Sequence, residues 1–255
     1  FLFLKKKKVV ICIHDFYLHK GEYNFIIQWI IYIEFLLSSE VVVFNKNVKD
    51  NIINSVIYKL CKKKINILFH GIENKKFSHL KQLSRNEKIK ILYIGRIHEY
   101  KGVLNLVNAF KKLDTKEFQL RILGRGEISP EIQRIVDNTP SIFLENNWID
   151  LKEIESEIIN CHLVALPYIE STQSGIMSDA FAYNTPCLIT PSDGLINQGL
   201  YGSVLCSGFC DHNIEKSLLS IKHNPSILNS LSEDIMKKKS KYYYENLELE
   251  FMKIL

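Results

Sequence analysis

The sequence has no apolar run of the roughly 20 residues that a transmembrane helix needs. Its longest apolar stretch, FIIQWIIYIEFLL at residues 25–37, has 13 residues and contains Gln28 and Glu34. No apolar run is therefore long enough to cross a bilayer. We expect part of this stretch to face the surface of the protein.

Cysteines are too few and too scattered for a disulfide framework in a chain of 255 residues. Only Cys206 and Cys210 are close in sequence, and no histidine or cysteine pair completes a zinc site beside them. We therefore expect reduced core thiols and no bound metal. The remaining cysteines are Cys12, Cys61, Cys161 and Cys187.

Composition and charge favour a folded chain with two unlike parts. Hydrophobic residues make up 46% and charged residues 24%, which is typical of a globular protein with one large or two small domains. Residues 1–85 hold 15 Lys and Arg against 6 Asp and Glu, a net charge of +9, whereas residues 86–255 hold 18 against 22, a net charge of −4. The asymmetry indicates two domains with different neighbours, or simply a lysine-rich surface.

Nucleic acid is not an expected partner, because the lysine runs at 5–8, 62–64 and 237–239 have no aromatic stacking residues between them.

Strand-like and helical patterns alternate along the chain. Residues 102–113 and 151–161 each place apolar side chains on one face of a helix. Near-continuous apolar strands that alternate with helices predict a doubly wound α/β fold with a parallel sheet covered on both faces. The predicted strands are 9–14, 40–44, 65–69, 90–95, 118–124, 141–145, 162–168, 186–190 and 203–206.

In such folds a ligand lies at the carboxyl ends of the strands, so the loops that follow strands are the candidate sites. The loop RIHEYKG after residues 90–95 carries Arg96 and Lys101 between Gly95 and Gly102. Two cations beside a helix N-terminus favour a phosphate or diphosphate, although they are also ordinary surface charges. After residues 118–124, Ser129 is expected to cap a helix that begins at Pro130.

A second candidate loop, ESTQSG, joins residues 162–168 to a helix that we expect to start near Ser174. Ser174 or Thr172 can cap that helix, and Gly175 allows a ligand to come close. Glu170 stabilises a helix N-terminus by about 0.3–1 kcal/mol in a purely structural interpretation. In the alternative interpretation, this loop and the loop with Arg96 together bind a sugar nucleotide. The residues alone do not decide between the structural and the ligand-binding interpretation.

Several segments, in order along the chain, resemble the retaining glycosyltransferases of family 4, which have the GT-B fold. The likeness to the C-terminal half of that family runs over about residues 88–222, through GRIHEYKG, LRILGRGE and PYIESTQSGIMSDAFAYNTPCLIT. VVICIHDFYLHKGE resembles the family's His-Asp segment, and INILFHGIE resembles the segment leading into the interdomain linker. We read His70 and Gly71, in the latter segment, as linker geometry.

The resemblance implies roles for particular residues. Arg96 and Lys101 would hold the donor diphosphate together with the family's Thr-Gln-Ser-Gly loop variant, and His14 would lie near the transferred sugar. Glu170 and His14 are the catalytic candidates, and Asp179 is the candidate for binding the nucleoside. The diphosphate-binding loop is Thr172, Gln173, Ser174 and Gly175.

The segment PYIESTQSGIMSDAFAYNTPCLIT departs from the family's pattern in two ways. Eight residues separate Glu170 from Asp179, where the family usually has seven between two glutamates. Alignment on DAFAYNTP gives the second carboxylate to Asp179 and the first position to Ser171, so the role of Glu170 stays open. Asn184 stands where a glycine is usual.

The domain organisation implied is GT-B-like, with two doubly wound domains of which the first is partial. Residues 1–85 would form a partial acceptor-side domain and linker, and residues 86–235 the nucleotide-sugar-binding domain. Residues 236–255 would form a C-terminal helix that packs back toward the first domain. Because residues 1–85 offer three strands and the chain does not begin with Met, we expect an N-terminally incomplete enzyme and poor catalysis.

The implied function is transfer of a sugar, with retention of configuration, from a nucleotide-sugar donor to a glycan or lipid-linked acceptor. Surface polysaccharide or lipopolysaccharide synthesis is the implied setting, without metal or cofactor. The resemblance further implies a cytoplasmic protein that is peripheral on an anionic membrane surface. The alternatives are a sugar-nucleotide epimerase of the same fold and a non-catalytic fragment that binds nucleotide sugars. The sugar, the nucleobase and the acceptor are left open.

Overall fold

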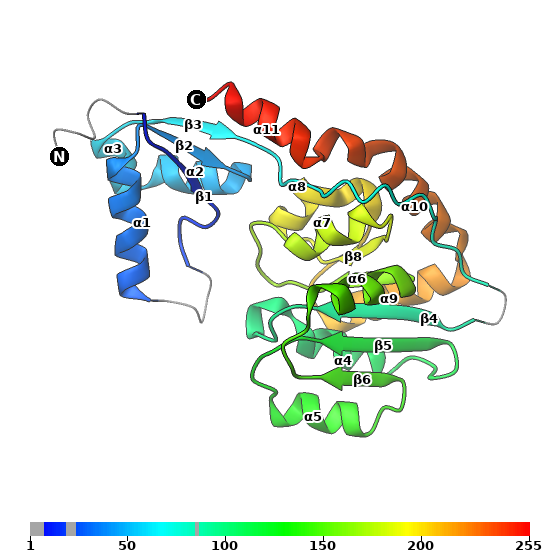
Figure 1. Cartoon of the computed structure of the whole chain (residues 1–255). Helices are drawn as coiled ribbons and strands as arrows, with labels where there is room; N and C mark the ends of the chain where they lie inside the picture. Colours follow the sequence, from blue (N-terminus) through cyan, green and yellow to red (C-terminus); the bar gives the residue numbers. More distant parts are fainter. Residues whose placement is uncertain (1–7, 19–23, 85–86) are drawn as a thin grey trace.

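The computed structural model describes residues 8–18, 24–84 and 87–255, which are built around two parallel β-sheets (Figure 1). The smaller sheet has the order β1-β2-β3, with β1 (Val10–Ile13), β2 (Glu40–Val43) and β3 (Lys64–Ile67). The larger sheet has the order β6-β5-β4-β7-β8-β9. Each predicted strand segment overlaps one of these strands, so the doubly wound α/β prediction is confirmed. The strands of the larger sheet are β4 (Ile89–Ile94), β5 (Phe118–Leu123), β6 (Ile142–Glu145), β7 (Leu163–Leu166), β8 (Cys187–Ile189) and β9 (Ser203–Leu205).

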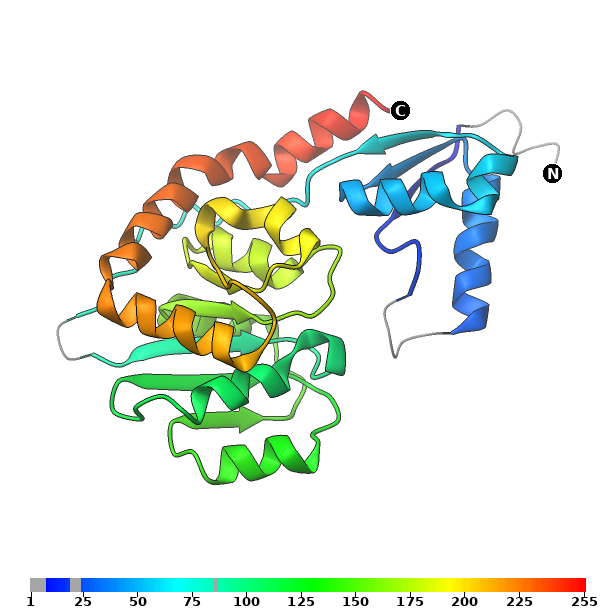
Figure 2. The same cartoon turned by 180° about the vertical axis from the view of Figure 1, so that it is seen from behind.

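Helices cover both faces of the larger sheet, with α4 and α9 on one face and α6 and α7 on the other (Figures 1 and 2). Strands buried between two helical layers explain the near-continuous apolar runs, and all four residues of β7 are buried. Ser129 caps α5 as predicted, by accepting a hydrogen bond from the amide of Ile132 at 3.3 Å. The helices up to α10 are α1 (Phe25–Leu37), α2 (Lys46–Asn54), α3 (Val56–Leu60), α4 (Val103–Phe110), α5 (Pro130–Asp137), α6 (Leu151–Asn160), α7 (Gly175–Ala182), α8 (Asp193–Gly199), α9 (Asp211–His223) and α10 (Ser226–Lys238).

The strand order of the larger sheet reverses between β4 and β7, which are neighbours although about 70 residues separate them. Ile91 pairs with Leu163 and Leu92 pairs with Val164 in parallel register. The loops that follow these two strands therefore leave the sheet at the same edge, side by side. These are the two loops that the sequence singles out.

The apolar stretch at residues 25–37 forms helix α1 (Phe25–Leu37), which packs on the smaller sheet. Asn24 caps its N-terminus by accepting a hydrogen bond from the amide of Ile26 at 2.9 Å. Gln28 is buried and donates to the carbonyl of Phe16 at 2.8 Å, which satisfies the polar group inside the helix. Phe35 is fully buried in the small core.

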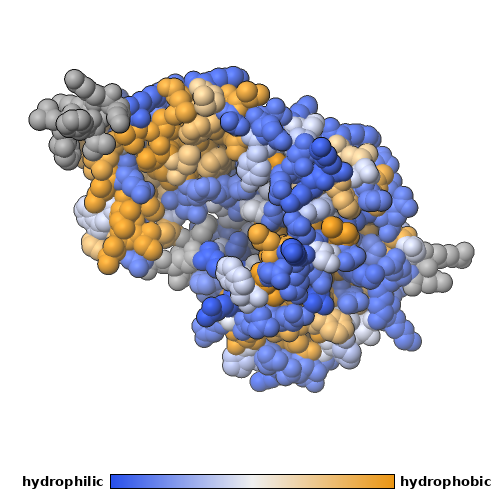
Figure 3. Space-filling view, in the orientation of Figure 1, coloured by the Kyte–Doolittle hydropathy of each residue, from blue (hydrophilic) through white to orange (hydrophobic). Residues whose placement is uncertain are grey.

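The opposite side of α1 is an exposed apolar face (Figure 3). Its side chains keep between 44% and 68% of their surface exposed. A typical monomer exposes no contiguous apolar patch larger than about 300–600 Å² without a function for it. No helix among the described residues is long and apolar enough to span a membrane. The exposed apolar face consists of Phe25, Ile26, Ile27, Trp29, Ile30, Ile33, Leu36 and Leu37.

The C-terminal segment is not the single helix expected over residues 236–255. α10 ends at Lys238, a 3-10 turn follows, and α11 (Tyr244–Met252) begins after an extended residue. The helix is interrupted because Ile72 of the linker donates to the carbonyl of Tyr242 at 2.8 Å and accepts from the amide of Tyr244 at 3.1 Å. Beyond this crossing, Ile254 packs against Val42 and Leu68 of the smaller sheet and its linker.

Lys239, in that 3-10 turn, caps the carboxyl end of α7. Its side chain is only 3% exposed and donates to the carbonyl of Ala182 at 2.8 Å. Burial of the ammonium group lowers the pKa of Lys239 from 10.5 to about 8. A buried cation thus holds the far end of the helix whose N-terminus faces the candidate site.

Lys239 is expected to make folding stability rise with pH between about 8 and 10.5. In this range the folded state loses the proton while an unfolded lysine keeps it, so raising the pH favours folding, whereas below about pH 8 both states hold the proton. Urea unfolding from pH 7 to pH 10 should therefore show the free energy of unfolding growing in the wild type relative to Lys239→Met. Cysteine and tyrosine titrations occur in both proteins and cancel in this difference. If the free energies of unfolding of the wild type and of Lys239→Met change in parallel with pH, the lowered pKa of Lys239 would be wrong.

Candidate functional site

The first part of the site is the N-terminus of α7. Of the two caps that the sequence allowed, Ser174 rather than Thr172 is the N-cap residue, and it accepts a hydrogen bond from the amide of Met177 at 3.3 Å. No described residue accepts a hydrogen bond from the amides of Gly175 or Ile176. A Cβ atom added at Gly175 would meet nothing within 4 Å. The helix therefore presents two unused N–H groups to open space, which favours an anion.

The second part is the loop between β4 and α4. Gly102 has a φ of 68°, and a Cβ atom there would lie 2.0 Å from the carbonyl oxygen of Pro167, so only glycine fits. Lys101 places its ammonium 3.6 Å from the centre of the Tyr168 ring, and the Arg96 guanidinium donates to the Tyr100 hydroxyl at 2.9 Å. The close approach to Pro167 therefore requires glycine at position 102, whereas at position 95 glycine is favoured by a backbone φ of 140°.

Tyr168 joins the two loops. Its buried hydroxyl lies 3.4 Å from the Oγ of Ser174, while its ring lies under Lys101. The amide of Ile169 also donates to the carbonyl of Tyr100 at 2.8 Å. Lys101 and the cap of α7 are thus held against opposite ends of one side chain. Two cations and two free amides at a strand-to-helix edge are suited to a diphosphate.

The smaller sheet contributes the opposite wall through residues that follow its strands. Asp15, next to His14, accepts a hydrogen bond from the Thr172 hydroxyl at 2.6 Å. His14 contacts the side-chain amide of Gln173, and its ring packs at a tilt against Phe44 with centroids 4.8 Å apart. The loop residues predicted to hold the donor are therefore engaged by the segment predicted to lie near the sugar.

Two asparagines that the sequence reasoning did not single out strengthen this contact. Asn45 donates to the carbonyl of Thr172 at 2.8 Å, and Asn47 donates to a carboxylate oxygen of Asp193 at 2.6 Å. Asn45 also caps α2. An asparagine at a helix N-cap is common, so its position in the sequence gave no sign of the contact with Thr172.

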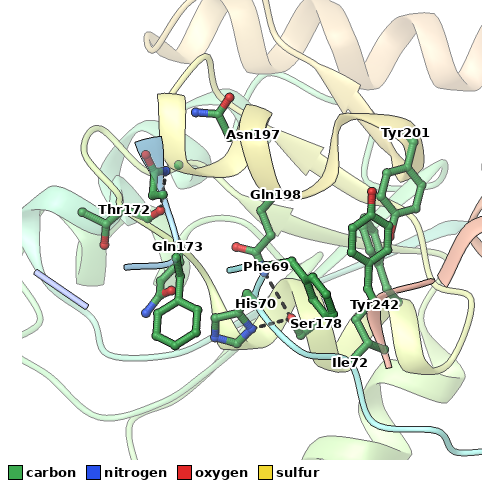
Figure 4. Close-up of a pocket in the computed structure, with 14 residues that line it drawn as sticks. Phe69, His70, Ile72, Thr172, Gln173, Ser178, Asn197, Gln198, Tyr201 and Tyr242 are labelled. Carbon is green, nitrogen blue, oxygen red and sulfur yellow. Dashed lines mark hydrogen bonds between the residues drawn. The ribbon is translucent and has the colours of Figure 1, made fainter. Parts of the chain in front are cut away.

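A pocket lies between the two sheets on the α8 side of the loop (Figure 4). It is narrow in this structure, with a cavity volume of about 50 Å³. The Oε1 of Gln173 and the hydroxyl of Tyr201 line this pocket, and both are buried without a hydrogen-bond partner. Aromatic walls and amide groups suit a ligand with hydroxyls on an apolar ring. The labelled lining residues are Phe69, His70, Ile72, Thr172, Gln173, Ser178, Asn197, Gln198, Tyr201 and Tyr242.

The carboxylate candidates occupy different places. Glu170 is exposed at the start of the loop. Asp179, on α7, keeps part of its surface exposed while its carboxyl is partly desolvated, and its charged neighbours come from the linker and α6 rather than from the loop with Arg96. Partial burial, and then the charge of Glu73, raise the pKa of Asp179 to about 6. Lys75 bridges Glu73 at 2.7 Å and Glu155 at 2.8 Å beside it.

Asn184, the second departure, is explained by its backbone. Its φ is 55°, a left-handed conformation that glycine adopts freely and asparagine tolerates best among the other residues. Its side-chain amide also donates to the carbonyls of Phe77 and His79, both at 3.1 Å. Asparagine therefore keeps the turn and ties the linker to the end of α7.

No group of three or more His, Cys, Asp or Glu side chains within residues 8–18, 24–84 and 87–255 is placed to hold a metal ion.

The comparisons with known proteins agree with this architecture. Residues 88–214 match the family described as "Glycosyl transferases group 1". A capsular polysaccharide biosynthesis glycosyltransferase, CapM of Staphylococcus aureus, is 23% identical over 199 residues, which are 72% of this chain and 51% of that protein. An uncharacterised protein in the cps region of Klebsiella pneumoniae is 22% identical over 156 residues, which are 57% of this chain and 42% of that protein. The chain spans about half the length of these curated relatives.

Solved structures resemble most of the chain in fold. Sucrose-phosphate synthase from Thermosynechococcus elongatus has a TM-score of 0.76 at 14% identity and covers 96% of this chain, which corresponds to 66% of that structure. Anabaena HepE, solved with UDP and glucose, has a TM-score of 0.71 at 12% identity, with 99% of this chain and 73% of that one covered. The chain thus has a GT-B-like α/β fold, and its residues 88–214, which include both loops of the candidate site, are similar to the glycosyl transferases group 1.

Proposed function

We propose that this protein transfers a sugar from a nucleotide-sugar donor to a glycan or lipid-linked acceptor, with retention of configuration. The setting proposed is the synthesis of a surface polysaccharide or lipopolysaccharide, as the likeness to a capsular glycosyltransferase suggests. One observation carries the proposal. Lys101 and the open N-terminus of α7 meet at Tyr168, so that cations and free amides converge where a nucleoside diphosphate would leave.

In this proposal, protein groups stabilise the leaving group and the leaving group acts as the base. Departure of the nucleoside diphosphate develops negative charge on its terminal phosphate. Arg96, Lys101 and the amides of Gly175 and Ile176 stabilise that charge electrostatically. The leaving phosphate then helps to deprotonate the acceptor hydroxyl on the same face of the sugar, which gives retention.

The sugar would lie between Gln173 and His14, with its hydroxyls toward the pocket where the Oε1 of Gln173 lacks a donor. His14 and Gln173 touch in this structure, so a sugar between them requires the two sheets to separate. Glu170, exposed at the rim, is proposed to contact the sugar, and Asp179 the nucleoside.

A membrane surface is proposed as a partner on the cytoplasmic side. The smaller sheet belongs to the part of the chain with a net charge of +9, and it carries the exposed apolar face of α1. Lys63 donates to the carbonyl of Leu36 at 2.9 Å, so the lysines at 62–64 lie at the carboxyl end of α1. An apolar face beside cations suits an anionic leaflet without insertion across it.

A transfer assay tests the proposal. UDP-, GDP- and ADP-sugars are incubated with the protein and a polyprenyl-phosphate-linked acceptor, and both products are measured. Transfer yields free nucleoside diphosphate and a glycosylated acceptor in equal amounts, whereas an epimerase yields no glycosylated acceptor. Because protein cations and amides neutralise the leaving group in this scheme, EDTA should leave the rate unchanged. An activity that EDTA removes and Mg²⁺ restores would contradict the scheme.

A further inference from the structure

Gln198 on α8 holds both polar groups of one backbone unit in the candidate diphosphate loop. Its Oε1 accepts a hydrogen bond from the amide of Ser174 at 2.7 Å. Its Nε2 donates to the carbonyl oxygen of Ser174, also at 2.7 Å. Ser174 is the N-cap residue of α7, so this side chain fixes the residue from which the helix starts.

This double contact decides which amides face the ligand. Because the amide of Ser174 is used by Gln198, the amides of Gly175 and Ile176 are the ones that remain for an anion. Rotation of the peptide groups around Ser174 would redirect the Gly175 amide. Both bonds to Gln198 oppose such a rotation.

The rest of α8 follows the same loop closely. A Cβ atom at Gly194 would lie 2.5 Å from the carbonyl oxygen of Ser171. The Ser192 hydroxyl lies 2.6 Å from the Ser171 hydroxyl. Glycine and serine at the start of α8 thus allow the approach that brings Gln198 to Ser174.

The side-chain amide of Gln198 is also connected to the linker between the two sheets, through Ser178 of α7 (Figure 4). Its Nε2 donates to the buried Oγ of Ser178 at 3.1 Å, and that Oγ lies 2.9 Å from the Nδ1 of His70. His70 in turn packs edge-on against Phe44, which follows β2, with ring centroids 6.2 Å apart. A continuous set of contacts therefore connects the smaller sheet and the linker to the N-terminus of α7.

We propose that Gln198 is a positioning residue for the donor diphosphate, and that Ser178 and His70 make its position depend on the linker between the two sheets. Gln198 orients the Ser174 backbone, and through it the two free amides, without touching the ligand. Movement of His70 as the sheets separate then alters the hold of Gln198 on the loop. The part of this proposal that concerns the diphosphate rests on the proposed function.

Two substitutions of Gln198 separate positioning from packing. Gln198→Leu removes all three hydrogen bonds and keeps the approximate volume. Gln198→Glu keeps the acceptor for the Ser174 amide but places a carboxylate against the Ser174 carbonyl and near the anion. We expect UDP, GDP or ADP, whichever the wild type binds, to bind about tenfold more weakly to Gln198→Leu, and more weakly still to Gln198→Glu. Gln133→Leu, on α5, is the matched control and should bind like the wild type.

Amide hydrogen exchange of residues 171–176 in the ligand-free protein gives a second, independent measurement. Exchange should be faster in Gln198→Leu and unchanged in Gln133→Leu. If the wild type binds no nucleoside diphosphate, the proposed function fails, and faster exchange still supports the positioning of the loop. Unchanged exchange in Gln198→Leu, or Gln198→Leu binding the nucleoside diphosphate as tightly as the wild type, would overturn the positioning role.

The connection to the linker is tested by a cycle of His70→Ala and Gln198→Leu, measured with and without Ser178→Ala. Ser178→Ala keeps both bonds between Gln198 and Ser174 but removes the oxygen shared with His70. We expect the effects of His70→Ala and Gln198→Leu on exchange of residues 171–176 to be non-additive in the presence of Ser178 and additive in its absence. Additive effects in both backgrounds would show that the linker does not act on this loop.

Discussion

Replacing Arg96 or Lys101 by alanine is expected to weaken binding of the nucleoside diphosphate by about 1.5–3 kcal/mol each, which is roughly ten- to 150-fold. Both side chains are held in place before a ligand binds. The Arg96 guanidinium donates to Tyr100, and the Lys101 ammonium lies over the Tyr168 ring. A preorganised cation loses little conformational entropy when the ligand binds. Its removal should therefore cost nearly the whole binding free energy of a hydrogen bond to a charged group.

Isothermal titration calorimetry with UDP, GDP and ADP measures this loss, and matched variants separate charge from structure. Lys101→Arg keeps a cation and should retain part of the affinity, while Lys101→Met keeps the stem and should lose as much as alanine. Arg134→Ala removes an exposed cation on α5, outside the candidate site, and should change nothing. Unchanged affinity in both Arg96→Ala and Lys101→Ala would place the anion elsewhere.

The sequence could predict this part of the site because its determinants are local. A strand, a polar loop and a helix follow one another within about 15 residues at each of the two loops. Ser174 caps α7 as its position before a helical stretch requires. The sheet then brings the loops together through the pairing of β4 with β7, which the alternation of strands and helices implies only in outline.

Contacts between distant segments could not be predicted in this way. Gln198 lies 24 residues from Ser174, and Asn45 lies 127 residues from Thr172. Glutamine on a helix and asparagine before one carry no distinctive pattern, because both residues are common at those positions. The hydrogen-bond partner of His70, Ser178, is 108 residues away. The interpretation of His70 as linker geometry did not predict this contact.

The break in the C-terminal segment has a similar cause. The residues from 239 to 243 do not differ strongly in helix propensity from those around them. The backbone leaves the helix because Ile72 of the linker supplies hydrogen bonds to Tyr242 and Tyr244. A partner 170 residues upstream thus overrides local preference, and the prediction of one helix over 236–255 fails for that reason.

The basic part of the chain is expected to bind anionic liposomes through two separable contributions. The first is charge, since each lysine near an anionic surface contributes about 1 kcal/mol. Lys59, Lys62 and Lys64 are exposed in the segment from α3 to β3, and Lys64 also pairs with Glu40 at 3.3 Å. Lys63 is not suitable for substitution, because it donates to the carbonyls of Leu36 and Ser38 and supports the end of α1. Of the lysines at 5–8, the first three lie outside the described residues.

The triple variant Lys59→Gln, Lys62→Gln, Lys64→Gln should therefore lose about 3 kcal/mol of binding at low salt, roughly 150-fold, in sedimentation with anionic liposomes. Lys111→Gln, Lys116→Gln, Lys216→Gln is the control with the same change of charge on exposed residues of the other part of the chain. Binding of the wild type should fall as the Debye length shortens from about 30 Å to about 3 Å. Equal binding to neutral and anionic liposomes at low salt would leave the charge asymmetry without this role.

The second contribution is the exposed apolar face of α1, and salt distinguishes it from charge. Ile30→Asn with Ile33→Asn removes apolar surface from a face whose side chains are about half exposed, so the fold should tolerate the change. Apolar burial is not screened by salt, so this variant should lose binding at both low and high salt, whereas the lysine variant should lose it only at low salt. If the protein binds neither kind of liposome but forms dimers that Ile30→Asn with Ile33→Asn dissociates, the face belongs to a protein contact instead. A residual, salt-resistant binding that only the isoleucine variant removes would place α1 in the membrane interface, with the lysines beside it on the anionic headgroups.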